Sequence, residues 1–174
     1  MGFWTKESVK KVGFNYVFAP TVALSHNPQW GRFYETMGQD ENWVEKYSQS
    51  FVKGLQDVRN DKINGALGTA KHYIGDGATL YGCNMGNAHV LRFKNFLNRN
   101  SRGYVGAVKS NVGSVMSSYS AVNWVPNAVN SELLLNNLRE TVGFNGFVIS
   151  DYDDLDRMFN TLMPRTFMNF TAEE

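Results

Sequence analysis

Four aspartates lie close together directly after an apolar run. The segment "FVISDYDDL" covers residues 147–155, and Asp156 follows it. Asp151 is the first residue after a predicted strand, which directs its carboxylate to the edge of a sheet. Asp153, Asp154 and Asp156 fall at the start of a predicted helix, where backbone N–H groups and the helix dipole favour carboxylates. We therefore predict that the Asp151 carboxylate takes part in chemistry, and that the other three cap the helix and face water.

Two other roles for this aspartate cluster fit the residues less well. An EF-hand loop is a poor fit, because position six is Asp156 instead of glycine and position twelve is Leu162 instead of glutamate. An aspartyl phosphotransferase is a remote alternative, with Asp151 as nucleophile and Asp153 as acid/base. That fold usually opens with this strand, whereas here only about two dozen residues follow it.

Charged side chains also follow the other predicted strands. Arg32 and Glu35 lie in the loop "NPQWGRFYE" at 27–35, Lys71 and His72 follow the second strand, and Tyr119 ends the third. Cations and imidazoles donate hydrogen bonds to polar ligands. Glu35 is equally well explained as a structural partner of Arg32. Adjacent strand residues point to opposite faces, so we expect the strand to end before Lys71.

A metal ion and a bound phosphate are both poor fits, and no cofactor is predicted. His72, Asp76 and His89 could be imagined as metal ligands, but their spacing matches no known ligand set. The "GDG" at 75–77 is not a phosphate loop. Leu80 stands where a glycine-rich fingerprint needs glycine, and Asp76 would repel phosphate.

Composition limits the classes of partner. The chain has 174 residues, 43% of them hydrophobic, enough for one domain with a sizeable core. A net charge of +1 predicts no affinity for nucleic acid or membrane, and Cys83 is the only cysteine. The N-terminus lacks the apolar core of a signal peptide. Aromatics make up 14%, and Trp30, Trp124 and Tyr152 could stack on a sugar ring or lie in the core.

Strands and helices alternate along the chain. This order predicts an α/β fold with parallel strands. Because reactive side chains follow each strand, we expect a partial (β/α)8 TIM-type barrel with about four β/α units. Strands are predicted at 15–20, 65–70, 113–120 and 146–150. Helices are predicted from Asp40, over 90–111 with a break near Gly103, from Asn130 to Gly143, and from Asp153.

Several blocks occur in an order that resembles glycoside hydrolase family 3, in particular its β-glucosidases and β-glucan exohydrolases. They extend from about residue 12 to residue 158. The blocks are "YVFAP", "NPQWGRFYE", "GLQ", "AKHYIGDG", "VMSSYS", "LR" and "GFNGFVISDYDDLDRM".

The resemblance implies a role for each matching residue. Asp151 would be the nucleophile, and Arg32, Lys71 and His72 would hold the hydroxyls of the innermost sugar. Tyr119 would lie close to the nucleophile. Tyr152 stands where the family often has a tryptophan that clamps the sugar.

The resemblance further implies retaining hydrolysis of β-glucosides or β-glucans through a covalent glycosyl-aspartate. In this family the acid/base is usually a glutamate from a second domain, and nothing in the chain corresponds to it. We therefore expect residues 1–174 to be a fragment of the N-terminal barrel domain with impaired activity, completed by a second domain or chain. The alternative is a non-catalytic, sugar-binding or non-functional fragment. The family is often secreted, which leaves the localisation of this chain open.

Overall fold

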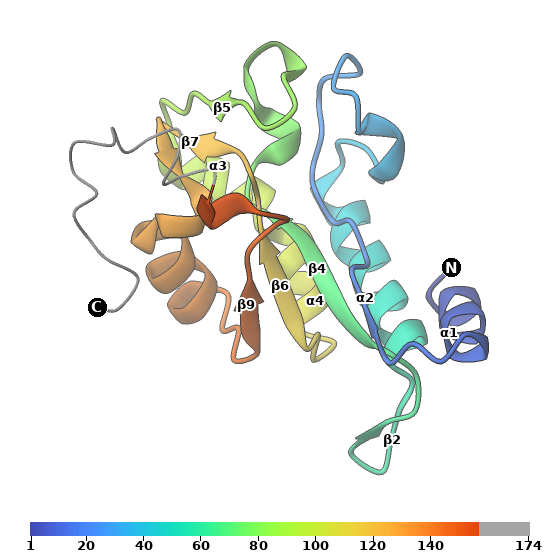
Figure 1. The fold of residues 1–174 in the computed structure, drawn as a ribbon. Helices are drawn as coiled ribbons and strands as arrows, with labels where there is room; N and C mark the ends of the chain where they lie inside the picture. Colours follow the sequence, from blue (N-terminus) through green and yellow to red (C-terminus); the bar gives the residue numbers. More distant parts are fainter. Residues whose placement is uncertain (157–174) are drawn as a thin grey trace.

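The computed structural model describes residues 1–156, and its core element is a parallel sheet (Figure 1). Helix α1 (Gly2–Lys11) precedes the sheet, whose strands pair in the order β1-β4-β6-β9. All three pairings are parallel. The four strands are β1 (Tyr16–Val17), β4 (Leu67–Tyr73), β6 (Ser114–Ser117) and β9 (Phe147–Ile149).

Helices connect each strand to the next and cover one face of the sheet. Helices α2 and α4 pack against each other on that face (Figure 1). A parallel sheet with helical crossovers confirms the predicted α/β class and the partial barrel. The crossover helices are α2 (Glu41–Gln56), α3 (Phe93–Asn100), α4 (Arg102–Val108) and the π-helix η5 (Glu132–Thr141). Within the described residues, no helix is long and apolar enough to cross a bilayer.

The predicted end of the second strand is wrong. Strand β4 continues through Lys71 and His72 to Tyr73, although a loop was expected from Lys71. The register with β6 shifts between Ala70 and Tyr73. A register shift of this kind re-aims side chains within a strand, and so two adjacent residues can serve one end of the sheet.

Short elements escaped the sequence analysis, because two or three residues show no periodicity. The β2–β3 hairpin (Val58–Arg59 and Lys62–Ile63) projects from the end of the sheet opposite the loops discussed below. A second small sheet contains β5 (Asn87–Ala88), β7 (Ala121–Val122) and β8 (Val125–Pro126). Four 3-10 turns complete the fold: η1 (Phe33–Glu35), η2 (Asp76–Ala78), η3 (Leu80–Gly82) and η4 (Asn127–Val129).

Helix α2 begins as predicted. Asp40 accepts hydrogen bonds from the N–H groups of Asn42 and Trp43, both at 2.9 Å. Trp43 lies on the helical repeat of apolar residues but is 57% exposed, and Val58, which continues this repeat in the sequence, belongs to β2. The apolar residues of α2 that are buried are Val44, Phe51, Val52 and Leu55.

The buried amide of Gln56 ties the end of α2 to the sheet. Its Oε1 accepts from the N–H groups of Gly68 and Gly113, each at 3.1 Å, and its Nε2 donates to the carbonyl of Asn111 at 2.8 Å. These bonds satisfy backbone groups where β4 and β6 begin. They give the "GLQ" block a structural role.

The two faces of the sheet differ in how much of each is covered by other elements. Ala70 and Val115 point into the core under the helices. On the alternate side, Ser114 Oγ contacts Thr69 Oγ1 at 2.6 Å, and Tyr16 packs on Phe147 with ring centroids 5.8 Å apart. Phe147 is 47% exposed, so this second face leaves apolar surface open to solvent.

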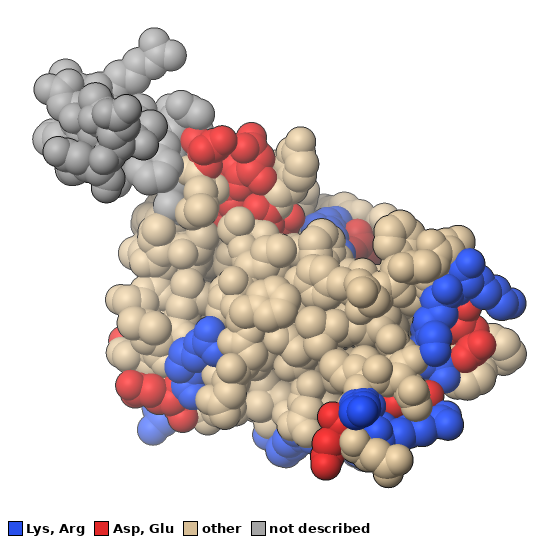
Figure 2. Space-filling model, turned by 60° about the horizontal axis from the view of Figure 1, so that its bottom comes forward, with Lys and Arg blue, Asp and Glu red and all other residues tan. Residues whose placement is uncertain are grey.

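Several charged groups on the surface form ion pairs. On the face in Figure 2, most Lys and Arg atoms lie beside Asp or Glu atoms. Lys6 pairs with Asp57 at 3.0 Å, and Glu45 pairs with Arg102 at 2.6 Å and Lys109 at 2.7 Å. The described part of this face therefore has no continuous basic surface.

The cap of α2 gives a first prediction. Replacing Asp40 with alanine removes the acceptor for two N–H groups and should lower the free energy of unfolding by about 0.5–2 kcal/mol. Urea unfolding followed by circular dichroism measures the change. Asp40→Asn keeps a side-chain acceptor and should lower the free energy of unfolding by only a few tenths of the loss seen with alanine. Equal losses in both variants would show that the capping hydrogen bonds do not stabilise the helix.

Candidate active site

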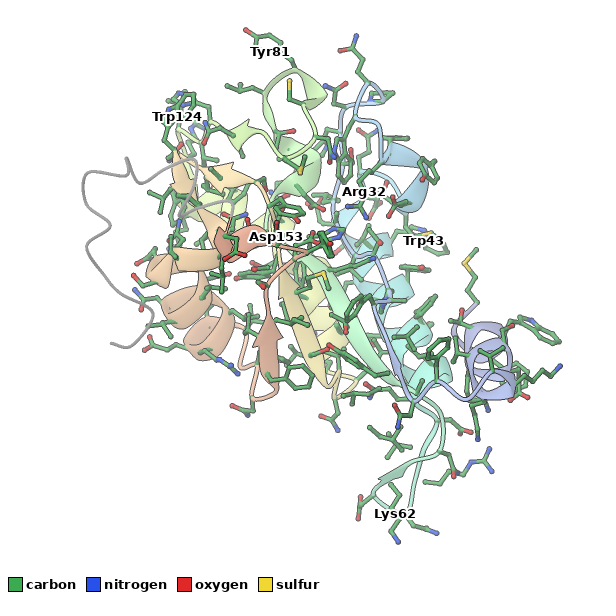
Figure 3. The ribbon with its side chains drawn as sticks, in the orientation of Figure 1. Arg32, Trp43, Lys62, Tyr81, Trp124 and Asp153 are labelled. Atoms are coloured by element: carbon green, nitrogen blue, oxygen red, sulfur yellow. The ribbon has the colours of Figure 1, made fainter. Side chains whose placement is uncertain are left out.

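Side chains that could do chemistry gather where the parallel strands end. Asp151 follows β9 by two residues, and Lys71 and His72 lie near the end of β4. Figure 3 shows Arg32 and Asp153 at this end of the sheet and Lys62 at the opposite end. The carboxyl ends of parallel strands are where barrel enzymes carry their active sites.

The imidazole of His72 lies between two carboxylates. It is 3% exposed, and its Nδ1 is 3.0 Å from Asp76 Oδ2. On the other side, its Nε2 is 3.6 Å from Asp151 Oδ2. The first distance is a hydrogen bond and the second is too long for one. His72 is therefore fixed on the Asp76 side and faces Asp151 with its other nitrogen.

Asp151 is held by its own turn. Its Oδ1 accepts from the N–H of Tyr152 at 2.7 Å, and its carbonyl accepts from the N–H of Asp154 at 3.2 Å. Its side chain is 16% exposed. Asp153 and Asp156 are exposed as expected, but Asp154 is 5% exposed. The prediction that Asp154 faces water is therefore wrong, because the turn directs it inward where the last described helix starts.

Arg32 and Glu35 form a two-point ion pair. Arg32 Nε and Nη2 each donate to a different Glu35 oxygen at 2.8 Å. These bonds lower the pKa of Glu35 and raise that of Arg32, although partial burial opposes both shifts. The turn η1 sets the spacing of three residues that permits this geometry. Glu35 is therefore held as a carboxylate and is unsuited to donating a proton at neutral pH.

Lys71 differs from Arg32 in having no direct partner. Among the described residues, no hydrogen bond or ion pair reaches its ammonium group, which is partly buried. Burial lowers its pKa, and the charge of Arg32 lowers it further. The carboxylates of Glu35, Asp151 and Asp76 oppose this shift. The cluster thus contains a cation with three unused N–H donors.

The aromatic candidates divide between core and surface. Trp30 is 2% exposed and belongs to the core, whereas Trp124 is 75% exposed. Tyr152 is also mostly exposed, at 86%. Tyr119 follows β6 by two residues and is partly buried.

Asp76 is a candidate residue to which the sequence analysis assigned no role. It contacts His72, while His89 is exposed, and no group of three His, Cys, Asp or Glu in the described residues could hold a metal ion. The sequence feature that could have indicated this contact is the spacing of four residues between His72 and Asp76, with a glycine on each side of Asp76.

These features define a partial β/α barrel with charged residues gathered at the carboxyl ends of its strands. The chain belongs to glycoside hydrolase family 3, because the model of the glycosyl hydrolase family 3 N-terminal domain matches residues 1–168. A β-xylosidase of Formosa agariphila is 30% identical over 167 residues, which are 91% of this chain and 22% of that protein.

Solved structures agree with this assignment. An exo-1,3/1,4-β-glucanase from a Pseudoalteromonas species superposes with a TM-score of 0.83 at 36% identity, covering 88% of this chain and 19% of that one. A β-glucosidase from Erythrobacter marinus superposes with a TM-score of 0.85 at 27% identity, covering 92% and 22%. The chain thus spans about a fifth of the length of these relatives.

The unpaired lysine gives a second prediction. Lys71→Met removes a charge that burial disfavours, and at pH 7 it should raise the free energy of unfolding by about 0.5–2 kcal/mol. The folded-state pKa of Lys71 lies below its ordinary value of 10.5, so the wild-type protein regains stability as pH rises between those two values. The advantage of the variant should therefore shrink toward pH 10.5.

The control for this prediction is Lys53→Met, since Lys53 is an exposed lysine on α2. It should change the free energy of unfolding by no more than about 0.5 kcal/mol at any pH. Urea titrations of the three proteins at several pH values make the comparison. If Lys71→Met lowers the free energy of unfolding at pH 7, the result contradicts the inference that burial of the Lys71 charge destabilises the folded protein.

Proposed function

We propose that this chain carries the nucleophile side of a retaining β-glycosidase site, in which Asp151 attacks the anomeric carbon. The observation that supports this most directly is the position of Asp151, beside the buried His72 at the carboxyl end of a parallel sheet. Family membership and the names of the relatives point to the same reaction class. β-Glucosides and β-glucans are the proposed substrates, and β-xylosides are the second candidate because several relatives are β-xylosidases.

The charges around Asp151 suit an attacking carboxylate. The Asp151 charge acts on both Lys71 and Arg32, so positive charge lies near the group that must react as an anion. As the carboxylate attacks, the bond to the leaving group breaks and a glycosyl ester forms on Asp151. Water then releases the sugar with the same anomeric configuration.

Hydrogen-bond donors near the nucleophile can hold the sugar. Lys71 has three unused N–H donors, and Arg32 keeps three of its five after binding Glu35. His72 faces the same space with Nε2. A neutral ligand with many hydroxyls is fixed by such donors.

The proton donor for the leaving group is proposed to come from another domain or chain. Glu35 is held as an anion by Arg32, and Asp76 is engaged with His72. Neither group meets the requirement for a protonated carboxyl about 5–5.5 Å from the nucleophile.

The test uses an activated substrate, which needs no proton donor for the first step. The purified chain is incubated with a 2,4-dinitrophenyl 2-deoxy-2-fluoro-β-glucoside, and separately with the corresponding β-xyloside, and its intact mass is followed over time. We expect a gain of one sugar, located on Asp151 by peptide mapping. The faster of the two reagents identifies the preferred sugar.

Two variants control the labelling. Asp151→Asn should abolish the adduct, whereas Asp153→Asn makes the same chemical change at an exposed neighbour and should label like wild type. A folded chain that binds the sugar without an adduct would favour the non-catalytic alternative. Mg²⁺-dependent hydrolysis of an aryl phosphate, lost in Asp151→Asn, would instead support a phosphotransferase.

A further inference from the structure

The "GDG" turn at 75–77 places a carboxylate directly against His72. Asp76 Oδ2 lies 3.0 Å from His72 Nδ1, and Asp76 Oδ1 accepts from the N–H of Gly77 at 3.1 Å. Both oxygens are thus occupied, and the side chains of Asp76 and His72 are buried. The carboxylate is fixed in orientation and is not free to bind a ligand itself.

The two glycines of this turn are required by its geometry. Gly75 has φ of +83°, a conformation that favours glycine, and a Cβ there would lie 2.6 Å from the ring of Phe96. A Cβ on Gly77 would lie 2.5 Å from the carbonyl oxygen of Leu24. Only a glycine at each position lets the chain pass this closely, and this brings Asp76 under the imidazole four residues behind it.

We propose that Asp76 is a positioning residue that makes Nδ1 of His72 the donor nitrogen and thereby presents Nε2 to the sugar beside Asp151. An ionised carboxylate only accepts hydrogen bonds, so the His72 nitrogen that contacts it carries a proton. The 3.6 Å between Nε2 and Asp151 Oδ2 leaves Nε2 available for a sugar hydroxyl. The effect on sugar transfer rests on the proposed function, but the state of the imidazole does not.

Asp76→Asn tests the proposal because it should reverse the tautomer. The N–H of Gly77 still needs an acceptor, so the asparagine Oδ1 turns toward Gly77. The NH₂ group then faces His72, and since it only donates, Nδ1 must become the acceptor. The proton of the neutral imidazole therefore moves to Nε2.

The measurement is a long-range ¹H–¹⁵N correlation spectrum of the uniformly labelled 174-residue chain, at a pH where its imidazoles are neutral. Protonated and bare ring nitrogens differ widely in ¹⁵N shift, and His72→Gln identifies the signals among those of His26 and His89. We expect protonated Nδ1 in the wild type and protonated Nε2 in Asp76→Asn. An unprotonated Nδ1 in the wild-type protein overturns the proposal, even if the variant does not fold. An unchanged tautomer in a folded variant also overturns it.

The matched control is Asp61→Asn, the same change in the exposed turn of the β2–β3 hairpin. It should alter neither the tautomer nor labelling by the fluoroglycoside. Asp76→Asn should slow labelling roughly 10- to 100-fold, as when an outer partner that orients a histidine is removed. A reversed tautomer with unchanged labelling would overturn the positioning role. Absence of labelling in the wild type would count against the proposed function and leave the tautomer result intact.

Discussion

The imidazole of His72 lies between Asp151 and the buried turn that contains Asp76. Its Nδ1 hydrogen bond to Asp76 anchors it to a turn that packs on Phe96 of α3 and on the backbone of Leu24. Its Nε2 faces Asp151, which follows the strand two places further across the sheet. The register shift in β4 is what allows Lys71 to serve the same end of the sheet as His72.

The two cations of the cluster, Arg32 and Lys71, differ in whether a carboxylate pairs with them. Arg32 is neutralised within its own loop by Glu35, and partial burial costs this pair little because its charges compensate each other. Lys71 has no such partner, and its pKa is lowered by burial. A group held against its solvation preference lowers stability, and such groups concentrate at functional sites. The contrast separates Arg32, whose charge is compensated within its own loop, from Lys71, whose charge has no direct partner among the described residues.

Sequence reasoning succeeded where a local rule decides the structure. The cap at Asp40, the four strands and the end of η5 near Gly143, with φ of +79°, follow from capping, apolar runs and glycine conformation. It failed where tertiary contacts decide. Trp43 lies at a helical repeat but faces solvent, and Asp154 is turned inward. Asp76 could not be placed, because the role of a short glycine turn depends on what packs around it. The sequence also contains one glycosylation sequon, Asn169-Phe170-Thr171, which lies outside the described residues.

The described contacts of Asp151 and of the charged groups near it lie within residues 32–154. They include the pairs Arg32–Glu35, His72–Asp76 and His72–Asp151, together with the turn after β9. Under the proposed function, the groups that would hold the attacking carboxylate and the sugar lie in this part of the barrel, whereas the proton donor is proposed to come from elsewhere. A retaining reaction needs the donor for an ordinary leaving group but not for one that departs as a stable anion. The proposed attack by Asp151 can therefore be tested separately from the protonation of an ordinary leaving group.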